Sequence, residues 1–425
     1  MKKKRHIVIV TYNWPPRNAS GTHRPYSWAK YWIKNDLRIT VLTAKKKVFD
    51  QPLDLNMPLI KNVKVIEVPY NQTFYNFLDK FLRFRIMNTF KKKIKNFFLK
   101  KLGSRIDPRY LWRKKANYYA LKLSKDADIV VSTFGPSASH LIGYDMKKFN
   151  PKLFWVADYR DLWSQGYNNI FSKAHVSKIK NIELLSVGKY ADLISTVSDH
   201  YAHKLQNFLG VKTIKVTNGF DLEKKIIFNR LKRKIVCPKG SMKIVYTGIV
   251  DLKSRNPKVL LSALASLYKK KIITNNTVTI DFYGSRIEDV KKLAKNPIYN
   301  KFIRIKGHVP RKIALKKQIN ASLLLLLESS DLSARGVVTG KIFEYITSGR
   351  PIICIGSKPE YEIGKILKET GTGRVFTLKD QKRIEDCITK TLKGNGLYYS
   401  FKPNIKNIMK YSRKNIALNF LKKLP

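Results

Sequence analysis

The chain has 425 residues, with 85 Lys and Arg against 29 Asp and Glu, which gives a formal net charge of +56. Its 44% share of hydrophobic residues is enough to bury a large core, which excludes a wholly disordered chain, and at roughly 100–200 residues per domain the length predicts two domains. Three widely spaced cysteines indicate no disulfide framework, and 21 Gly with 17 Pro are too few for a fibrous chain.

The first half of the chain alternates short apolar strands with helices. Residues 7–10 are expected to form a buried parallel strand and residues 21–34 a helix. The other strands expected in this half cover residues 39–42, 63–68, 129–131, 153–157, 193–196 and 213–216. The alternation predicts one doubly wound α/β unit that ends near the turn signal Asn218 and Gly219.

The start of the chain is basic at residues 2–5, as in a signal peptide. The apolar run behind it is only a strand long and soon meets Pro15 and Pro16, so no export signal is expected. No apolar run approaches the roughly 18 residues that span a bilayer, and the chain is not expected to cross a membrane.

The second half repeats the alternation. Its expected strands cover residues 243–246, 277–283, 303–305, 323–327 and 351–355. Its expected helices cover residues 257–270, 287–295, 311–320 and 340–348. The turn signal Asn218-Gly219, with the basic stretch 224–239 behind it, is interpreted as an interdomain hinge. Two such units facing one another would leave a cleft at the carboxyl ends of their strands, where open α/β sheets bind ligands.

One basic amphipathic segment, residues 74–115, breaks this rhythm. Phe and Leu recur in it at helical spacing among lysines such as those at positions 91–93. Such a helix suits an interfacial membrane anchor, because its apolar face enters the headgroup region while its lysines meet anionic lipid. An amphipathic helix packed on its own domain would show the same pattern, and both interpretations stay open.

Two groups of residues in the first half follow strands. Gly21 stands before a helix, where backbone can approach an anionic ligand, although a plain connecting loop explains it equally well. Asp158, Arg160 and Trp163 directly follow the strand 153–157. A polar and aromatic cluster at the carboxyl end of a strand is expected to point into the cleft, with Asp158 best placed, and a structural ion pair is the less favoured alternative.

Two stretches in the second half suit phosphate. Lys253 and Arg255 follow Gly248 just before a helix, although ordinary surface cations would look alike. The stretch 336–345 superficially suggests a P-loop, but its glycine spacing and Ile342 exclude a Walker-type site. Gly340 opens a helix with Glu344 one turn inside, which suits phosphate at the backbone N–H groups and a ribose diol at the carboxylate.

In order and spacing these pieces resemble the GT-B-type glycosyltransferases of family 4, which include bacterial surface-polysaccharide enzymes. The resemblance covers nearly the whole chain. It rests on Pro15-Pro16 with Gly21, Asp158-x-Arg160-Asp161-x-Trp163, Thr196-x-Ser198, Asn218-Gly219-x-Asp221, Gly248 with Arg255, and Lys341-x-x-Glu344-Tyr345 with Gly349-x-Pro351. It implies an α/β fold of GT-B architecture, with two facing Rossmann-like domains and an interdomain cleft.

The resemblance also implies a domain plan. Residues 1–219 would bind the acceptor and residues 220–395 the donor. Residues 396–425, with a helix over 405–423, would return to the first domain. The implied reaction is retaining, hexosyltransferase-type transfer from a UDP- or GDP-linked sugar, without an essential metal or other cofactor.

The resemblance assigns roles to individual residues. The donor would be held by Gly248, Lys253, Arg255, Gly284, His308, Val309, Gly340, Lys341 and Glu344. Asp158, Arg255 and Glu344 are the expected catalytic residues. Acceptor contacts are expected from Tyr12, Gly21, Arg24, Arg160 and Trp163, since aromatic rings suit sugars and arginines suit anionic groups.

The chain departs from the family pattern at three positions. Gly336 stands where the motif has its first glutamate, which usually touches the donor sugar. Ile249 replaces an arginine that many members place on the diphosphate, and Asp158 replaces a histidine. Asp158 is still expected to orient the donor or stabilise positive charge on the sugar ring in the transition state.

We therefore expect a transferase that acts on a glycan or lipid-linked acceptor in cell-surface polysaccharide biosynthesis. The net charge and the segment 74–115 predict an anionic membrane surface as a partner and a place in the cytoplasm on the inner face of the membrane. The rival is a non-enzymatic polyanion-binding protein or an inactive transferase-like scaffold, favoured by Gly336 and Ile249. Specific nucleic-acid binding is not expected, because no aromatic-studded module is present.

Overall fold

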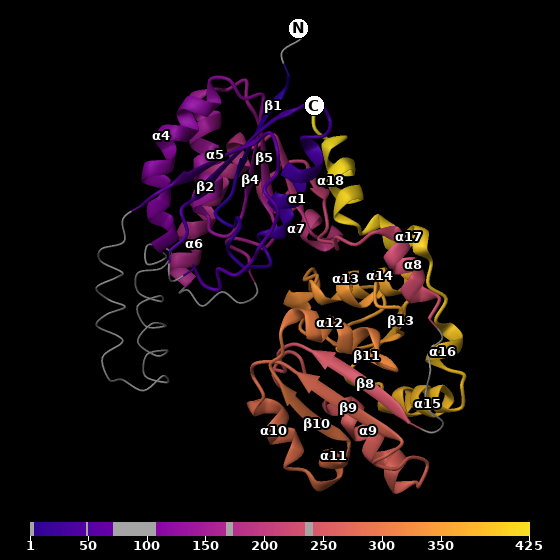
Figure 1. Ribbon diagram of the computed structural model, residues 1–425. Coiled ribbons are helices and arrows are strands. Elements are labelled where there is room, and N and C mark those ends of the chain that lie inside the picture. The colour runs from indigo at the N-terminus through magenta and orange to yellow at the C-terminus, as the bar shows by residue number, and fades with distance from the viewer. Residues whose placement is uncertain (1–3, 48–49, 71–107, 167–172, 234–240) are drawn as a thin grey trace. The chain divides into compact units, whose positions relative to one another are not determined.

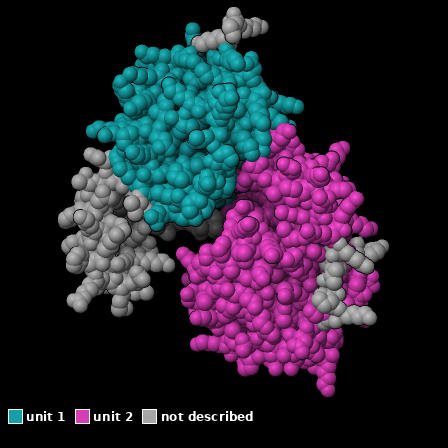
Figure 2. Space-filling model, viewed as in Figure 1, with its two compact units in different colours: residues 1–217, 416–425 teal, residues 218–415 magenta. Residues whose placement is uncertain are grey.

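The computed structural model describes residues 4–47, 50–70, 108–166, 173–233 and 241–425, and the chain divides into two compact units (Figures 1 and 2). Unit 1 comprises residues 1–217 and 416–425, and unit 2 comprises residues 218–415. The chain therefore passes from one unit to the other twice. Most of the basic segment 74–115 lies outside the described residues.

Unit 1 contains a seven-stranded sheet in the order β3-β2-β1-β4-β5-β6-β7, and every adjacent pair is parallel. The strands are β1 (His6–Val10), β2 (Arg38–Ala44), β3 (Val63–Val68), β4 (Ile129–Thr133), β5 (Phe154–Tyr159), β6 (Leu193–Thr196) and β7 (Thr213–Lys215). β1, β4 and β6 are buried along their whole length, which explains their continuous apolar sequence. The strand order reverses between β1 and β4.

Helices follow the strands of unit 1. They are α1 (His23–Trp32), η3 (Pro108–Leu111), α4 (Trp112–Ser124), α5 (Ala138–Phe149), α6 (Lys173–Glu183), the π-helical turn η4 (Leu184–Gly188) and α7 (Asp199–Leu209). The helix α18 (Arg413–Leu421) joins this unit from residue 416 onward.

The α18 helix packs on α1 (Figure 1). The ring centroid of Phe420 lies 5.3 Å from that of Trp28 and 5.5 Å from that of Trp32, and the two indoles stack at 5.6 Å. The indole N–H of Trp32 donates to the carbonyl oxygen of Ala417 at 2.8 Å. The end of the described chain thus completes the core on one face of the unit 1 sheet.

Unit 2 contains a six-stranded, fully parallel sheet in the order β10-β9-β8-β11-β12-β13. The strands are β8 (Met242–Thr247), β9 (Val278–Tyr283), β10 (Ile303–Gly307), β11 (Leu323–Leu327), β12 (Ile352–Ile355) and β13 (Gly373–Phe376). Apolar clusters cover both faces of this sheet, so β11 consists of five buried leucines. The strand order reverses between β8 and β11.

The helices of unit 2 complete the double winding. They are α8 (Lys224–Leu231), α9 (Lys258–Lys269), α10 (Glu288–Ala294), α11 (Pro297–Phe302), α12 (Arg311–Ile319), η5 (Leu332–Ala334), α13 (Lys341–Tyr345), α14 (Glu362–Thr370), α15 (Gln381–Leu392), α16 (Leu397–Ser400) and α17 (Ile405–Lys410).

The predicted class of fold, two doubly wound parallel α/β units, is confirmed. Each strand expected from the sequence is present, and the structure adds β13. The chain first passes between the units at Asn218, at the predicted turn signal, whereas the first part of the basic stretch 224–239 forms α8 around the buried Ile227. The single helix expected over 405–423 is broken, because Phe220 donates to the carbonyl of Tyr411 and accepts from the N–H of Arg413.

Candidate active site

The carboxyl ends of β8 and β11 lie side by side at the reversal point of the unit 2 sheet. Gly248 follows β8, Gly284 follows the neighbouring β9, and Glu328 follows β11. Ligands of open α/β sheets bind at such a reversal, because the loops on its two sides diverge and leave a crevice. The predicted donor site is therefore expected at this edge of unit 2.

Gly248 is needed here for both its backbone and its lack of a side chain. Its φ of +147° favours glycine, and a Cβ at this position would overlap Nζ and Cε of Lys341. A Cβ at Gly284 would overlap the carbonyl oxygen of Gly248. The two glycines and Lys341, all predicted donor residues, are thus brought together in the structure.

Lys341 is a half-buried cation at the start of α13. Its Nζ lies 5.4 Å from the ring centroid of Tyr246. Burial lowers the pKa of Lys341 to about 8 with help from Arg255, while Glu328 and Glu344 act in the opposite sense. Lys341 is therefore mostly protonated at neutral pH, and it loses its proton as the pH rises through about 8.

Arg255 comes from a turn that Asp251 organises. The carboxylate of Asp251 accepts hydrogen bonds from the N–H of Lys253 at 3.0 Å and the hydroxyl of Ser254 at 2.8 Å. Its carbonyl accepts from the N–H of Arg255 at 2.6 Å. The turn fixes the backbone of Arg255, which is half-buried, while Lys253 is exposed. Ile249 lies in the same loop, where its carbonyl accepts from the Tyr246 hydroxyl at 2.7 Å.

Glu328 is a buried carboxylate that the sequence-based prediction missed. Only 8% of its surface is exposed, and its Oε1 atom is buried with no hydrogen-bond partner among the described residues. Burial raises the pKa of Glu328 to about 7, against the opposing effects of Arg255 and Lys341. The available signal was an acidic residue placed directly after the five leucines of β11.

Glu344 lies at the end of a hydrogen-bond network on α12 and α13. Its Oε1 accepts from Arg311 at 2.8 Å, and its Oε2 accepts from the amide of Gln318 at 3.3 Å. The same Gln318 amide donates to the hydroxyl of Thr247, the last residue of β8, at 2.9 Å. The Glu344 side chain remains 27% exposed, so it is held in place yet open to a ligand.

The remaining predicted donor residues lie on nearby segments of unit 2. Gly340 caps α13 and is exposed, but this helix is only five residues long, so its dipole is weaker than the sequence suggested. His308 is exposed and Val309 half-buried, between β10 and α12. Gly336 is buried within the loop that precedes α13.

Unit 1 encloses Asp158 and Arg24 instead of opening them to a ligand. The Arg24 guanidinium donates from Nε and Nη2 to both carboxylate oxygens of Asp158, the shortest bond being 2.6 Å. The hydroxyls of Thr133 and Ser195 also donate to Asp158, which is 0% exposed. The prediction that Asp158 points into an open cleft therefore differs from the structure, because Arg24 comes in from α1 to neutralise it.

Gly21 and Arg160 meet at the carboxyl edge of the unit 1 sheet. A Cβ at Gly21 would overlap the Arg160 guanidinium and the amide of Asn13, which in turn donates to the carbonyl of Gly135 at 2.8 Å. Arg160 donates to Ser20 at 3.1 Å and Asp161 at 2.5 Å, and its Nε is buried without a partner among the described residues. These residues span the reversal between β1 and β4, the equivalent of the unit 2 site.

The two aromatic acceptor residues lie in different surroundings. Tyr12 is 0% exposed, and its hydroxyl donates to Asp50 at 2.8 Å, so it belongs to the core. Trp163 is half-buried, with its ring centroid 6.1 Å from Phe134 and 6.4 Å from His140. Trp163 is thus the better placed of the two to meet a ligand.

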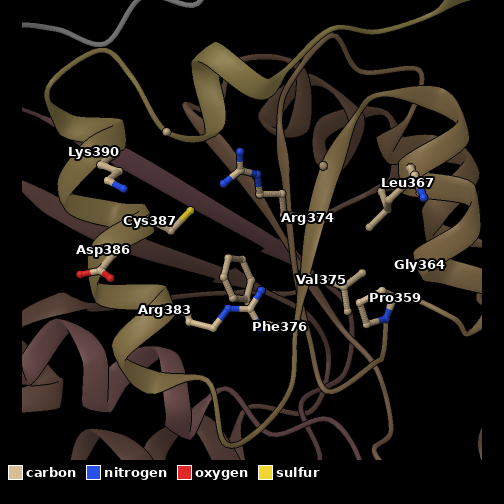
Figure 3. Close-up of a pocket in the computed structure, with 13 residues that line it drawn as sticks. Pro359, Gly364, Leu367, Arg374, Val375, Phe376, Arg383, Asp386, Cys387 and Lys390 are labelled. Atoms are coloured by element: carbon tan, nitrogen blue, oxygen red, sulfur yellow. The ribbon is translucent and has the colours of Figure 1, made fainter.

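A separate hollow of about 380 Å³ lies beside the edge strand β13 (Figure 3). It is lined by Arg374 and Phe376 from the strand and by Asp386, Cys387 and Lys390 from α15. None of the predicted donor residues lines it. The hollow is therefore distinct from the reversal point between β8 and β11.

Within the described ranges, no group of three or more His, Cys, Asp or Glu side chains could hold a metal ion. No helix in the part of the chain that the structure describes is long and apolar enough to cross a bilayer.

Comparison with known proteins identifies the fold. No family model and no curated protein sequence matches the chain. Among solved structures, sucrose-phosphate synthase from Thermosynechococcus elongatus is 12% identical in sequence and has a TM-score of 0.64. The match covers 99% of this chain and 98% of the chain of that protein. Anabaena HepE in complex with UDP is 12% identical, with 99% of both chains covered and a TM-score of 0.61.

A third similar structure, the lipopolysaccharide outer core galactosyltransferase WaaB, is 13% identical in sequence and has a TM-score of 0.59. The match covers 99% of this chain and 100% of the chain of that protein. At such low identity these likenesses establish the fold and leave the reaction open. The chain has the GT-B fold.

Proposed function

We propose that the protein is a glycosyltransferase that transfers a sugar from a nucleoside diphosphate donor. The observation that carries the proposal is the pair of cations, Arg255 and Lys341, beside Gly248 at the reversal point of unit 2. The GT-B neighbours include HepE, whose structures contain UDP and UDP-glucose. The proposed donor is UDP- or GDP-linked, and the diphosphate would lie against Arg255, Lys341 and the exposed Lys253.

The charges in this site suit the proposed chemistry. When the bond between sugar and diphosphate breaks, negative charge grows on the leaving phosphate, and fixed cations stabilise that charge. Gly248 and Gly284 let the backbone approach the ligand. Glu344, held by Arg311 and Gln318, would accept hydrogen bonds from the ribose hydroxyls, and His308 and Val309 would border the base.

In the proposed reaction Asp158 acts through Arg24. Its carboxylate is enclosed by three side-chain partners, so we assign it a positioning role at the carboxyl end of β5. Arg160, Gly21 and Trp163 would contact the acceptor. Retaining, metal-independent, hexosyltransferase-type transfer of family 4 belongs to this proposal, as the sequence resemblance implies it.

The proposed acceptor is a glycan or lipid-linked intermediate of cell-surface polysaccharide synthesis, at the inner face of the cell membrane. The net charge of +56 supports attraction to anionic lipid. Flotation with liposomes tests this part: the protein should float with vesicles rich in anionic lipid and stay behind with neutral ones. Equal recovery with both would remove the membrane partner and leave the donor site untouched.

Thermal unfolding with a panel of nucleoside diphosphates and nucleotide sugars tests the donor site. At a hundredfold excess over Kd, one base should raise the melting temperature by roughly 5 °C, and pyrophosphate by less. Glu344→Ala should lose this selectivity, and Glu360→Ala, at an exposed position of the same unit, should retain it. If pyrophosphate raises the melting temperature as much as every nucleotide does, and Glu344→Ala shows the same shifts as wild type, the polyanion-binding alternative is favoured.

A further inference from the structure

Glu328 is a rigidly held carboxylate at the reversal point of unit 2. Its backbone N–H donates to the carbonyl of Ile355 at 2.9 Å, and its own carbonyl lies so close to Gly356 that a Cβ there would overlap it. The backbone on both sides is therefore fixed by the sheet. The side chain leaves this fixed point with 8% of the residue exposed and with Oε1 unpartnered among the described residues.

Burying a carboxylate oxygen without a hydrogen bond costs free energy unless nearby charge offsets it. Two cations act on Glu328, Arg255 from the loop after β8 and Lys341 from α13. The other titratable groups that feel its charge are Tyr246 on β8 and Cys354 on β12, both uncharged at neutral pH. Glu328 therefore supplies negative charge within a site that otherwise presents cations.

Glu344 is the second carboxylate that acts on Lys341, but it is itself paired with Arg311. Within the described ranges, neither Arg255 nor Lys341 forms an ion pair or a side-chain hydrogen bond. Each also disfavours the charge of the other, because Arg255 lowers the pKa of Lys341. Glu328 offsets this repulsion while no ligand is present. A purely structural carboxylate would be expected to pair fully with one cation, as Asp158 does with Arg24.

We propose that Glu328 is a positioning residue that balances Arg255 and Lys341 while the site is empty and takes up one proton from solvent when a nucleoside diphosphate binds. The inference rests on the proposed donor site and adds to it the means by which the site accommodates a large negative charge. The carboxylate gains a proton at an oxygen, no other bond changes, and the buffer supplies the proton.

The direction of the proton transfer follows from the charges. Burial places the pKa of Glu328 at about 7 even though both cations lower it. A bound diphosphate neutralises those cations and adds negative charge nearby, so the pKa of Glu328 must rise further and the carboxylate becomes protonated. The same ligand charge keeps Lys341 protonated. Binding should therefore consume protons at and just above neutral pH.

Calorimetric titration with UDP and GDP in two buffers of different ionisation enthalpy measures this uptake directly. At about pH 7.5 the wild-type protein should take up more than about half a proton per bound nucleotide. Lys341→Arg, which holds a permanent cation, should keep the uptake due to Glu328, and Lys341→Arg combined with Glu328→Gln should take up almost none, because neither position can then gain a proton. Glu360→Gln, at an exposed position of the same unit, is the matched control and should equal wild type.

The wild-type affinity gives a second measurement that needs no variant. By linkage, an uptake of half a proton or more means that affinity falls at least about threefold per pH unit between about pH 7 and pH 8. Glu328→Asp keeps a titratable group and should keep most of the uptake if Glu328→Gln fails to fold.

The outcomes separate the two proposals. If neither nucleotide binds the wild-type protein, the proposed donor site fails, and this inference fails with it. If a nucleotide binds with the same proton uptake in Lys341→Arg and in the double variant Lys341→Arg with Glu328→Gln, the donor site stands and the role of Glu328 is overturned. A wild-type affinity that stays constant between pH 7 and pH 8 overturns it equally.

Discussion

The guanidinium of Arg24 donates through two nitrogens to the carboxylate of Asp158, and the pair lies almost wholly out of solvent. It joins α1 to the carboxyl end of β5, two elements that are 134 residues apart in sequence. A buried pair of this kind adds little to stability as a whole, but removing one partner strands the other charge. The pair therefore fixes how α1 meets the sheet.

Asp158→Asn should destabilise unit 1 by about 3–5 kcal/mol, because the Arg24 guanidinium is left buried without its counter-charge. All six tryptophans of the chain, at positions 14, 28, 32, 112, 155 and 163, belong to unit 1, so urea unfolding followed by tryptophan fluorescence reports on this unit. The control is Asp145→Asn, at the more exposed Arg113 pair, with an expected loss nearer 1 kcal/mol. Equal losses would argue against a special role for the buried pair.

Gly248→Ala should weaken nucleoside diphosphate binding by about tenfold or more, because the new Cβ occupies the space of Lys341 Nζ and displaces this cation. Gly394→Ala is the matched control, since Gly394 also has a positive φ, +81°, but open space around its Cβ position. Both variants bear the backbone strain, and only the first disturbs the site. Calorimetric titration should show the loss in Gly248→Ala alone.

The affinity for a nucleoside diphosphate should fall as pH rises above about 8, where free Lys341 loses its proton. The pKa of Lys341 is lowered in the folded protein, so its charge is present below pH 8 and lost above it. Lys341→Arg keeps its charge at every such pH and should show a shallower fall from about pH 8 to pH 10, since only the proton taken up by Glu328 then links affinity to pH. If wild type and Lys341→Arg fall in parallel, another group controls the loss.

His140 should make unit 1 less stable in acid. Burial lowers the pKa of this 0% exposed imidazole to about 3, with Asp158 acting in the opposite sense. The unfolded chain binds a proton at about pH 6.5 and the folded protein does not, so stability falls as pH decreases from about 6.5 to 3. The contribution should approach about 1.4 kcal/mol per pH unit near pH 4–5.

The comparison that isolates this contribution is His140→Leu. Its free energy of unfolding, followed by tryptophan fluorescence, should depend less steeply on pH than that of wild type over the same window. Parallel curves for the two proteins would show that the imidazole is protonated in the folded state, contrary to its burial among Phe134, Tyr159 and Trp163.

Much of the fold was predictable because short strands buried on both faces read as continuous apolar runs, as in the five leucines of β11. The strand β13 escaped notice because it is only four residues long and carries Gly373 and the exposed Arg374. The break between α17 and α18 depends on backbone hydrogen bonds to Phe220, almost 200 residues away. The local hydrophobic periodicity of residues 405–423 cannot indicate so distant a partner.

The site was predictable only in part, for a related reason. Spacing correctly placed Gly248 and Lys341 near one another, because each ends or begins an element at the same edge of one sheet. Whether Asp158 faces solvent or Arg24 is decided by how α1 packs, and one strand's sequence does not encode it. Glu328 was missed because no motif marks it, and its burial and missing partner exist only in three dimensions.

The order of segments along the chain has a consequence for how the protein is made. The residues that cover Trp28 and Trp32, around Ala417 and Phe420, are translated only after the whole of unit 2. During synthesis, Trp28 and Trp32 therefore lack their contacts with Ala417 and Phe420 until the nearly 200 residues of unit 2 have been translated. Unit 2 is one continuous stretch of the chain, so a fragment can contain it whole. A fragment of unit 1 that ends at residue 217 would expose the apolar surface that Ala417 and Phe420 cover, until residues 416–425 are supplied as a separate peptide.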